Sequence, residues 1–317
     1  MLLPVLLLAA CTGAPEADPV PSSPPPSRPV SASATPGPTP PTPAEQPVRT
    51  GPRPLRAGTA MLVVRHLAGT VGPGHATSPA FRRAESWVAR RLAALGYDVR
   101  RQHFRVPAGV SWGVRVGAGR SANVLAAPAG FDPRRPHLVL GAHLDTVPQA
   151  PGAEDNASGV GVLLAVAEAV AGRRTRLPVL FVAFGAEEPR GAGDDHHHYG
   201  SRHYVAGLGP AERRAVRGMV SLDRVGVGPV AVVSSTGPPD PARARVLAAA
   251  RRAGVPVAPM TDDRASDHWS FVLAGMPGTR VGSTPYAAYH STADRVGVVE
   301  PAQLRRSARL ALAWVSG

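Results

Sequence analysis

Residues 141–159, GAHLDTVPQAPGAEDNASG, hold one histidine and three acidic side chains in a stretch rich in Gly, Ala and Pro. His143 and Asp145 follow a run of apolar residues, whereas Glu154 and Asp155 precede a segment with the pattern of a helix. Such a stretch is either a solvated acidic turn or half of a metal site. The other ionisable residues of the chain decide between these two interpretations.

Further acids and a histidine follow other apolar runs of the chain. Glu187 and Glu188 follow VLFVAFGA, Asp223 ends MVSLD, and His290 lies in YHSTAD. In an open α/β sheet, ligands bind beyond the carboxyl ends of the strands, so all these side chains should meet at one place. Unpaired carboxylates gathered there would repel one another and resist burial. A bound cation would remove that cost.

The set of candidate ligands contains imidazoles and carboxylates but no thiolate, which suits zinc in a catalytic site. Two histidines and three carboxylates are too many for one tetrahedral ion with an open position. They suit two metals that share a bridging carboxylate at a separation of about 3.5–4 Å. Adjacent residues of extended backbone point in opposite directions, so one of Glu187 and Glu188 can bind metal while the other faces water as a general base. A surface Glu-Glu pair is the alternative, but the apolar run before it argues against exposure.

Alternating strand and helix patterns must position these residues. We expect helices at 59–69, 78–96, 158–172, 241–254 and 303–317, and strands at 97–106, 123–127, 137–143, 178–188 and 219–223. In the second helix, Ser78 can serve as the N-cap, Pro79 suits the first turn and Gly96 ends it. This alternation predicts an α/β sandwich with a largely parallel core sheet.

The N-terminal part of the chain reads as an export signal and a tether. Residues 1–10 are an apolar run too short to span a membrane, and the sequence up to Cys11 resembles the lipobox of bacterial lipoproteins. An ordinary signal peptide is the alternative. Residues 12–56 are rich in Pro, Ser and Thr, which predicts an extended linker. We therefore expect a signal over 1–11, a linker over 12–56, a catalytic domain over 57–317, and a protein lipid-anchored outside the cytoplasm or secreted.

The strong positive charge does not indicate a nucleic-acid partner. The formal net charge is +13, but the arginines are scattered and aromatic residues make up only 5% of the chain. A nucleic-acid binder usually clusters its basic residues. Cys11 is the only cysteine, so no internal disulfide can form. We expect a monomer that does not bind nucleic acid.

Six motifs, in the order GAHLDTV, EDNASG, AFGAEE, SLDRVG, SDHWSF and YHSTAD, resemble those of the secreted bacterial two-zinc aminopeptidases. Relatives of that family include glutamate carboxypeptidase and the glutaminyl cyclases. The resemblance spans residues 57–317. It implies a three-layer αβα sandwich with a mixed, mainly parallel central sheet, and an exopeptidase that acts on peptides with a free N-terminus.

The resemblance also implies a role for each motif residue. It implies two zinc ions, with His143 and Asp223 on one, Glu188 and His290 on the other, and Asp155 bridging them. For catalysis it implies Glu187 as the general base and Tyr289 as the residue that stabilises the tetrahedral intermediate.

Several further residues are expected to support the site or merely to lie near it. Asp145 would orient His143, with Asp267 and His268 as additional support, whereas Glu154 is expected to be only a neighbour of Asp155. Arg280 could meet a substrate carboxylate, but a surface arginine is the favoured interpretation.

Some alternatives remain open. A carboxypeptidase or a glutaminyl cyclase of the same fold, or a non-catalytic zinc-binding lipoprotein, could carry these motifs. The one-zinc cyclases typically have Trp before the last histidine ligand, where this chain has Tyr289, which favours a peptidase. The segment 189–199, PRGAGDDHHHY, is longer than the link in relatives. A polar insertion near the cleft mouth is favoured over a third metal site or a substrate gate.

Overall fold

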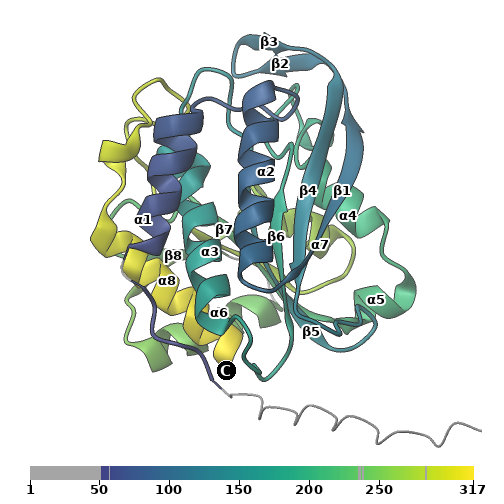
Figure 1. The fold of residues 1–317 in the computed structure, drawn as a ribbon, viewed down its shortest axis with the longest axis vertical. Coiled ribbons are helices and arrows are strands. Elements are labelled where there is room, and N and C mark those ends of the chain that lie inside the picture. Colours follow the sequence, from purple (N-terminus) through teal and green to yellow (C-terminus); the bar gives the residue numbers. More distant parts are fainter. Residues whose placement is uncertain (1–50, 57, 235–236, 238, 283) are drawn as a thin grey trace, which may run out of the picture. The chain divides into compact units, whose positions relative to one another are not determined.

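A central sheet organises the computed structural model, which describes residues 51–317 except 57, 235–236, 238 and 283 (Figure 1). All described residues belong to one unit, Pro47–Gly317. Eight strands form the sheet, in the spatial order β1 (Asp98–Val106), β4 (Gly119–Ala127), β6 (Val179–Phe184), β5 (His137–His143), β7 (Val216–Asp223), β10 (Gly278–Gly282), β8 (Ala231–Ser234) and β9 (Val257–Met260). The central strands β6, β5, β7 and β10 run parallel, whereas β1, β4 and β8 introduce antiparallel pairs. The expected mixed, mainly parallel sheet is confirmed.

Helices cover both faces of this sheet, as the ribbon shows (Figure 1). One layer contains α1 (Thr59–Val64), α2 (Pro79–Ala94), α3 (Gly159–Val170), α6 (Pro241–Ala253) and α8 (Pro301–Ser316). The opposite layer contains α4 (Tyr199–Ala206) and α7 (His268–Leu273), and the short α5 (Pro210–Ala215) leads into β7. Within β5, Leu140 packs into the first core and Val139 into the second, because successive side chains of a strand point to opposite faces. The expected three-layer sandwich is confirmed.

The strands next to the candidate site are buried along their whole length. Every residue of β5 and of β6 is buried, as expected for parallel strands covered on both faces. β5 lies between β6 and β7 and runs parallel to both, so the carboxyl ends of all three strands meet at one edge of the sheet. This edge is where the sequence predicted the ionisable residues to gather.

The helix signals in the sequence agree with the structure at α2 and differ in detail at the first helix. Ser78 Oγ accepts a hydrogen bond from the Phe81 main-chain N–H at 3.0 Å, with Pro79 at the first position of α2. The helix expected over 59–69 begins as α1 and continues as the π-helical η1 (Arg65–Val71), which ends at Gly72 with φ 74°. Within the described residues, no helix has the length and apolar character needed to cross a membrane.

Several elements were not expected from the sequence. They are the hairpin of β2 (Gly109–Ser111) and β3 (Val114–Val116), the strands β8, β9 and β10, and the helices α4, α5 and α7. The strand expected over 178–188 ends earlier, at Phe184. Ala186 adopts a φ of 56°, so the backbone leaves the extended conformation before Glu187.

Candidate active site

The ends of two central strands supply the first candidate ligands. His143 is the last residue of β5 and Asp223 is the last residue of β7. Asp155 lies in η2 (Ala153–Ser158), the turn that leads into α3. Each of these three side chains is almost fully buried. Parallel strand register and the turn before α3 therefore bring together residues from three parts of the chain.

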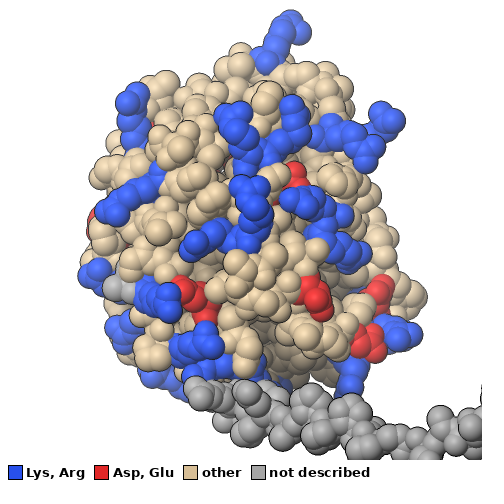
Figure 2. Space-filling view, viewed as in Figure 1, with Lys and Arg blue, Asp and Glu red and all other residues tan. Residues whose placement is uncertain are grey.

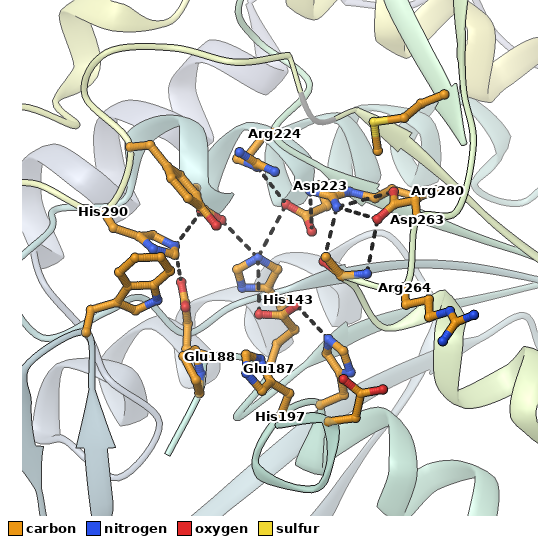
Figure 3. Close-up of a pocket in the computed structure, with 18 of the residues that line it drawn as sticks. His143, Glu187, Glu188, His197, Asp223, Arg224, Asp263, Arg264, Arg280 and His290 are labelled. Atoms are coloured by element: carbon orange, nitrogen blue, oxygen red, sulfur yellow. Dashed lines mark hydrogen bonds and ion pairs between the residues drawn. The ribbon is translucent and has the colours of Figure 1, made fainter. Parts of the chain in front are cut away.

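The remaining candidate ligands come from loops at the same edge. Glu187 and Glu188 lie in the turn after β6, and His290 lies in the loop between β10 and α8. Figure 3 shows the Glu187 carboxylate beside His143, and the Glu188 carboxylate directed toward the His290 ring on the same side of the cleft. The structure thus brings together all the residues for which the sequence predicted metal binding or general-base catalysis.

The Asp155 carboxylate lies between two imidazoles. Its Oδ1 is 3.1 Å from His143 Nε2, and its Oδ2 is 3.1 Å from His290 Nε2. Each oxygen therefore faces a different histidine. A carboxylate that presents its oxygens in this way can contact two neighbouring cations.

Each imidazole also has a second carboxylate nearby. Asp223 Oδ1 lies 3.6 Å from His143 Nε2, and Glu188 Oε1 lies 3.4 Å from His290 Nε2. Two sets of three donor atoms lie within 4.8 Å of one another: His143 with Glu187 and Asp223, and His143 with Asp155 and Glu188. Glu187 therefore lies close enough to share the centre, whichever role it takes.

This donor set fits a divalent cation. Buried carboxylates need compensating charge, and Glu188 Oε1 has no hydrogen-bond partner although it is fully shielded from solvent. The donors are imidazole nitrogens and carboxylate oxygens without a thiolate, the combination found in catalytic rather than structural zinc sites. The cluster is thus built for a metal by its chemistry as well as by its geometry.

The protonation of the cluster leads to the same interpretation. Burial opposes ionisation of Asp155, but the His143 and His290 imidazoles outweigh it and hold the pKa of Asp155 well below its usual range. Burial raises the pKa of Glu188 to about 8. Burial also disfavours a charged His290, yet its contacts with Asp155 and Glu188 raise the pKa of His290 to about 9. Without metal, imidazolium groups supply the positive charge that the acids require, so metal binding would release protons.

Asp145 supports the site in a different way from that expected. His143 Nδ1 contacts the main-chain carbonyl oxygen of Asp145 at 3.1 Å, whereas the Asp145 carboxylate is 3.9 Å away. The carboxylate instead accepts the main-chain N–H groups of Glu187 at 3.0 Å and Glu188 at 3.2 Å. The expectation is therefore corrected: the backbone of Asp145 orients the histidine, and its side chain fixes the Glu187–Glu188 turn.

Two buried acids hold the turn that carries Asp155. Asp294 accepts the main-chain N–H groups of Glu154 at 2.8 Å and Asp155 at 3.1 Å. The Glu154 carboxylate accepts the Gly226 N–H at 2.9 Å, and burial raises the pKa of Glu154 to about 8. Glu154 was expected to be only a neighbour of Asp155. Its side chain in fact joins the ligand turn to the loop after β7.

Arg280 is part of the site, and its interpretation as a surface arginine is wrong. Its side chain is 1% exposed and lies on β10, beside β7. Nη2 is 3.1 Å from Asp223 Oδ2, and Nη1 is 3.3 Å from Asp263 Oδ1. The Arg280 guanidinium outweighs burial and keeps the pKa of Asp223 well below its usual range. One oxygen of Asp223 is therefore paired with arginine, while the other faces His143.

Asp267 and His268 are buried behind the cleft. Burial and the nearby Glu187 carboxylate raise the pKa of Asp267 to about 7. His268 Nε2 contacts the main-chain oxygen of Asp263 at 2.9 Å, and burial lowers the pKa of His268 to about 4. Asp267 thus interacts electrostatically with the cluster, whereas His268 belongs to the environment of Asp263 and Arg280.

The β2–β3 hairpin forms one side of a cleft of about 410 Å³ that opens over the cluster. Trp112, at the tip of the hairpin, is 52% exposed, and its ring centroid is 4.2 Å from that of His290. Tyr289 stacks on His290 with ring centroids 3.6 Å apart, and the Arg224 guanidinium lies 4.3 Å from the Tyr289 ring centroid. Gln149 Nε2 donates to the main-chain oxygen of His290 at 3.1 Å. Two aromatic side chains therefore lie against one of the candidate ligands.

The segment 189–199 only partly matches its interpretation as a polar insertion. Asp194 and His197 line the cleft, as expected for residues near its mouth. His198, however, is buried, and its Nε2 is 3.3 Å from Glu187 Oε1. Burial disfavours the charged ring, but the Glu187 carboxylate outweighs it and raises the pKa of His198. The contact between His198 and the expected general base, Glu187, was not predicted from the sequence.

Part of the chain that includes this cluster matches a known protein family. Residues 123–315 match the family described as Peptidase family M28. The chain belongs to peptidase family M28. The match includes all the candidate ligands, but it begins after the β2–β3 hairpin, so Trp112 lies outside it.

Individual relatives and solved structures are also similar to this chain. Aminopeptidase YwaD of Bacillus subtilis is 28% identical over 207 residues, which cover 62% of this chain and 44% of that protein. The alignment thus spans less than half the length of that relative. BSAP, a zinc aminopeptidase from Bacillus subtilis, superposes with a TM-score of 0.72 at 19% identity, covering 83% of this chain and 95% of that one. A glutaminyl cyclase from Porphyromonas gingivalis superposes with a TM-score of 0.70 at 20% identity, covering 82% and 97%. Likeness at this identity shows the fold and does not separate peptidases from cyclases.

Proposed function

We propose that this M28 chain is a zinc-dependent aminopeptidase that hydrolyses the first peptide bond of peptides with a free N-terminus. The observation that carries the proposal is the Asp155 carboxylate, whose two oxygens each lie 3.1 Å from a different imidazole. Membership of a peptidase family supports the same reaction, as does the name of the Bacillus relative, an aminopeptidase.

The assignment of residues to zinc is the one that the sequence resemblance implies, and the contacts within the cluster support it. His143 and Asp223 would hold one ion, Glu188 and His290 the other, and Asp155 both. Zinc, when bound, supplies a Lewis acid that polarises a carbonyl and makes water more acidic. Two ions rather than one are supported by the number of buried donors, which exceeds what one tetrahedral ion with an open position needs.

Glu187 and Tyr289 would perform the remaining chemistry. Glu187 Oε2 faces His143, at a distance of 4.0 Å from Nε2, where it can accept a proton from the attacking water and return it to the leaving amine nitrogen. The Tyr289 side chain lines the same cleft, from which its hydroxyl can donate a hydrogen bond to the substrate carbonyl oxygen. These two roles require no movement of the strands that carry the ligands.

The test is a panel of aminoacyl nitroanilides with free amines, assayed beside the same compounds with acetylated amines. We expect hydrolysis of the free-amine set alone, its loss on chelation and its recovery when zinc is restored. Hydrolysis of acetylated substrates at equal rates would contradict an aminopeptidase. Removal of C-terminal residues from peptides with blocked N-termini would identify a carboxypeptidase instead.

A glutaminyl cyclase is the second candidate, and Arg280 is the observation that favours it. Arg280 Nη2 lies 3.1 Å from Asp223 Oδ2, and its positive charge already compensates this carboxylate, which weakens the case for a second ion beside it. Incubation with peptides that begin with glutamine separates the two activities. A cyclase releases ammonia and leaves the peptide bonds intact, whereas an aminopeptidase releases free glutamine.

Location and assembly are also part of the proposal. Cys11 lies outside the described residues, and we propose that its lipidation anchors the protein outside the cytoplasm as a monomer. The resemblance of residues 1–11 to a lipoprotein signal supports this. Replacement of Cys11 by Ser should abolish incorporation of radiolabelled fatty acid and release the protein from membranes. Light scattering of the purified protein should give the mass of one chain.

A further inference from the structure

The segment from Pro189 to His197 leaves the active site and returns to it at a fixed position. The main-chain N–H of His198 donates to the Glu187 carbonyl at 3.0 Å, and that of Tyr199 donates to the Ala186 carbonyl at 2.8 Å. These two bonds join the ends of the segment, so His198 lies opposite Glu187 whatever the intervening residues do. The pairing of the backbone thus places an imidazole beside the expected general base.

The local packing keeps His198 in this position. Its φ is 56° and its ψ is 34°, a left-handed conformation that costs free energy for a residue other than glycine. Immediately after it, Gly200 passes so close to the Gly185 carbonyl that a Cβ atom would overlap it. The chain therefore packs tightly against the turn after β6 at this point, and the His198 side chain is buried there.

The three consecutive histidines of this segment have different environments. His196 is exposed, His197 is half-buried at the cleft, and His198 is 5% exposed. Of the three, His198 has its Nε2 within 3.3 Å of Glu187 Oε1, as an ion pair whose angles lie outside hydrogen-bond geometry. Its burial and contact distinguish it from a polar surface residue.

The contact divides the two oxygens of the Glu187 carboxylate between two histidines. Oε1 faces His198, whereas Oε2 lies 4.0 Å from His143 Nε2, on the side of the metal ligands. The terminal torsion of a glutamate is broad, so a carboxylate without a partner would sample many orientations. Holding one oxygen fixes the direction of the other.

We propose that His198 is a positioning residue, whose Nε2–H pairs electrostatically with Glu187 Oε1 and thereby keeps Oε2 directed at the substrate and the attacking water. This inference rests on the proposed function, because it assigns a partner to the general base of that reaction. His198 itself does not exchange protons with the substrate. A catalytic group held loosely can lose about 100-fold in rate, which sets the size of the effect expected.

Kinetics of three variants test the proposal. His198→Ala should lower kcat by about 10- to 100-fold with KM within about threefold, since orientation of the base matters most in the transition state. His198→Gln, which keeps an N–H donor at similar reach, should recover kcat to within about fivefold of the wild type. His196→Ala is the matched control, because it removes an exposed imidazole from the same segment, and it should leave both constants unchanged. Equal losses in the Ala and Gln variants at unchanged melting temperature would overturn the proposal.

A double-mutant cycle separates positioning from a general structural role. In a Glu187→Ala background, His198→Ala should lower the residual rate by less than about twofold, because the group that it positions is gone. A loss as large as in the wild-type background would show that His198 acts independently of Glu187. Zinc content of each variant, measured by mass spectrometry, should match the wild type.

A spectroscopic measurement keeps this inference distinct from the proposed function. In ¹⁵N spectra of the full chain, His198 Nε2 should carry a slowly exchanging hydrogen whose signal shifts in Glu187→Ala. An Nε2 without hydrogen in the wild type would overturn the inference even if the enzyme is active. If the wild type hydrolyses no peptide, the proposed function fails, and the spectrum alone then decides whether the pair exists.

Discussion

The floor and the rim of the cleft differ in how they are held. The floor consists of the shielded side chains of His143, Asp155, Glu188, Asp223 and His290, and the rim consists of the β2–β3 hairpin and the segment 189–198. Asp155 is 4% exposed and receives its position from an N–H bond to Asp294, whereas Trp112 is 52% exposed. The M28 match includes the floor but begins only after the hairpin. The floor therefore sets which reaction is possible. The rim is suited to set which substrates enter and how the general base is oriented.

The largest effect should follow from removing the residue shared by both halves of the floor. Asp155→Ala should weaken zinc binding by about 100-fold or more and abolish hydrolysis, since even loss of a supporting group costs 10- to 100-fold in affinity. Isothermal titration of the metal-free protein with zinc measures the change directly. Unchanged affinity for two ions would show that Asp155 is not a shared ligand.

Removal of the general base should affect turnover without affecting the metal. Glu187→Gln should lower kcat by about 10²- to 10⁴-fold while zinc content stays at the wild-type value, because the amide cannot accept the proton of water. Steady-state kinetics and metal analysis of one preparation provide both values. Loss of zinc in this variant would instead make Glu187 a ligand, which its distance to His143 allows.

The floor should also depend on the acid that holds its ligand turn. Asp294→Ala leaves the N–H groups of Glu154 and Asp155 buried without an acceptor, at a cost of about 1–3 kcal/mol each. Urea unfolding of the metal-free protein should therefore show a loss of about 2–6 kcal/mol. Arg295→Ala, at the next position and exposed, should change the stability by less than about 0.5 kcal/mol.

The smallest effect is expected at Trp112, on the exposed hairpin of the rim. Trp112→Ala should raise KM for peptides with apolar residues by about 3- to 10-fold and leave kcat almost unchanged, as an aromatic contact contributes roughly 0.5–1.5 kcal/mol. Leu273→Ala, which removes another exposed apolar side chain away from the cleft, is the control. If Trp112→Ala lowered kcat as strongly as a change in the floor, the distinction between floor and rim would be lost.

The sequence predicted the floor well because its signals are local. HLVLGAH is a continuous apolar run, and the rule that parallel strands end at one edge then places His143 near Asp223 without further information. The N-terminus of α2 could likewise be predicted from Ser78 and Pro79. For such residues, the apolar pattern of the sequence and the topology of the sheet are enough to predict which side chains lie close together.

The rim and Arg280 could not be placed in the same way. β2 and β3 have three residues each, too few for a period to be recognised, so Trp112 gave no sign of lying over His290. The burial of His198 depends on backbone bonds to Ala186 and Glu187 rather than on its neighbours in sequence. Arg280 did carry a signal, since an arginine within the apolar run MPGTRVGS must be paired if that run is a strand.

The position of Asp294 in the sequence affects when the ligand turn can form during synthesis of the chain. It lies 139 residues after Asp155, yet its carboxylate holds the N–H groups of the ligand turn. Domains generally fold as units, so this turn gains its acceptor only after the segment that carries Asp294 has been synthesised. The ligand turn is completed only when nearly the whole polypeptide has been synthesised. A chain truncated before Asp294 would leave the N–H groups of Glu154 and Asp155 without this acceptor, so the ligand turn would lose the contact that holds it.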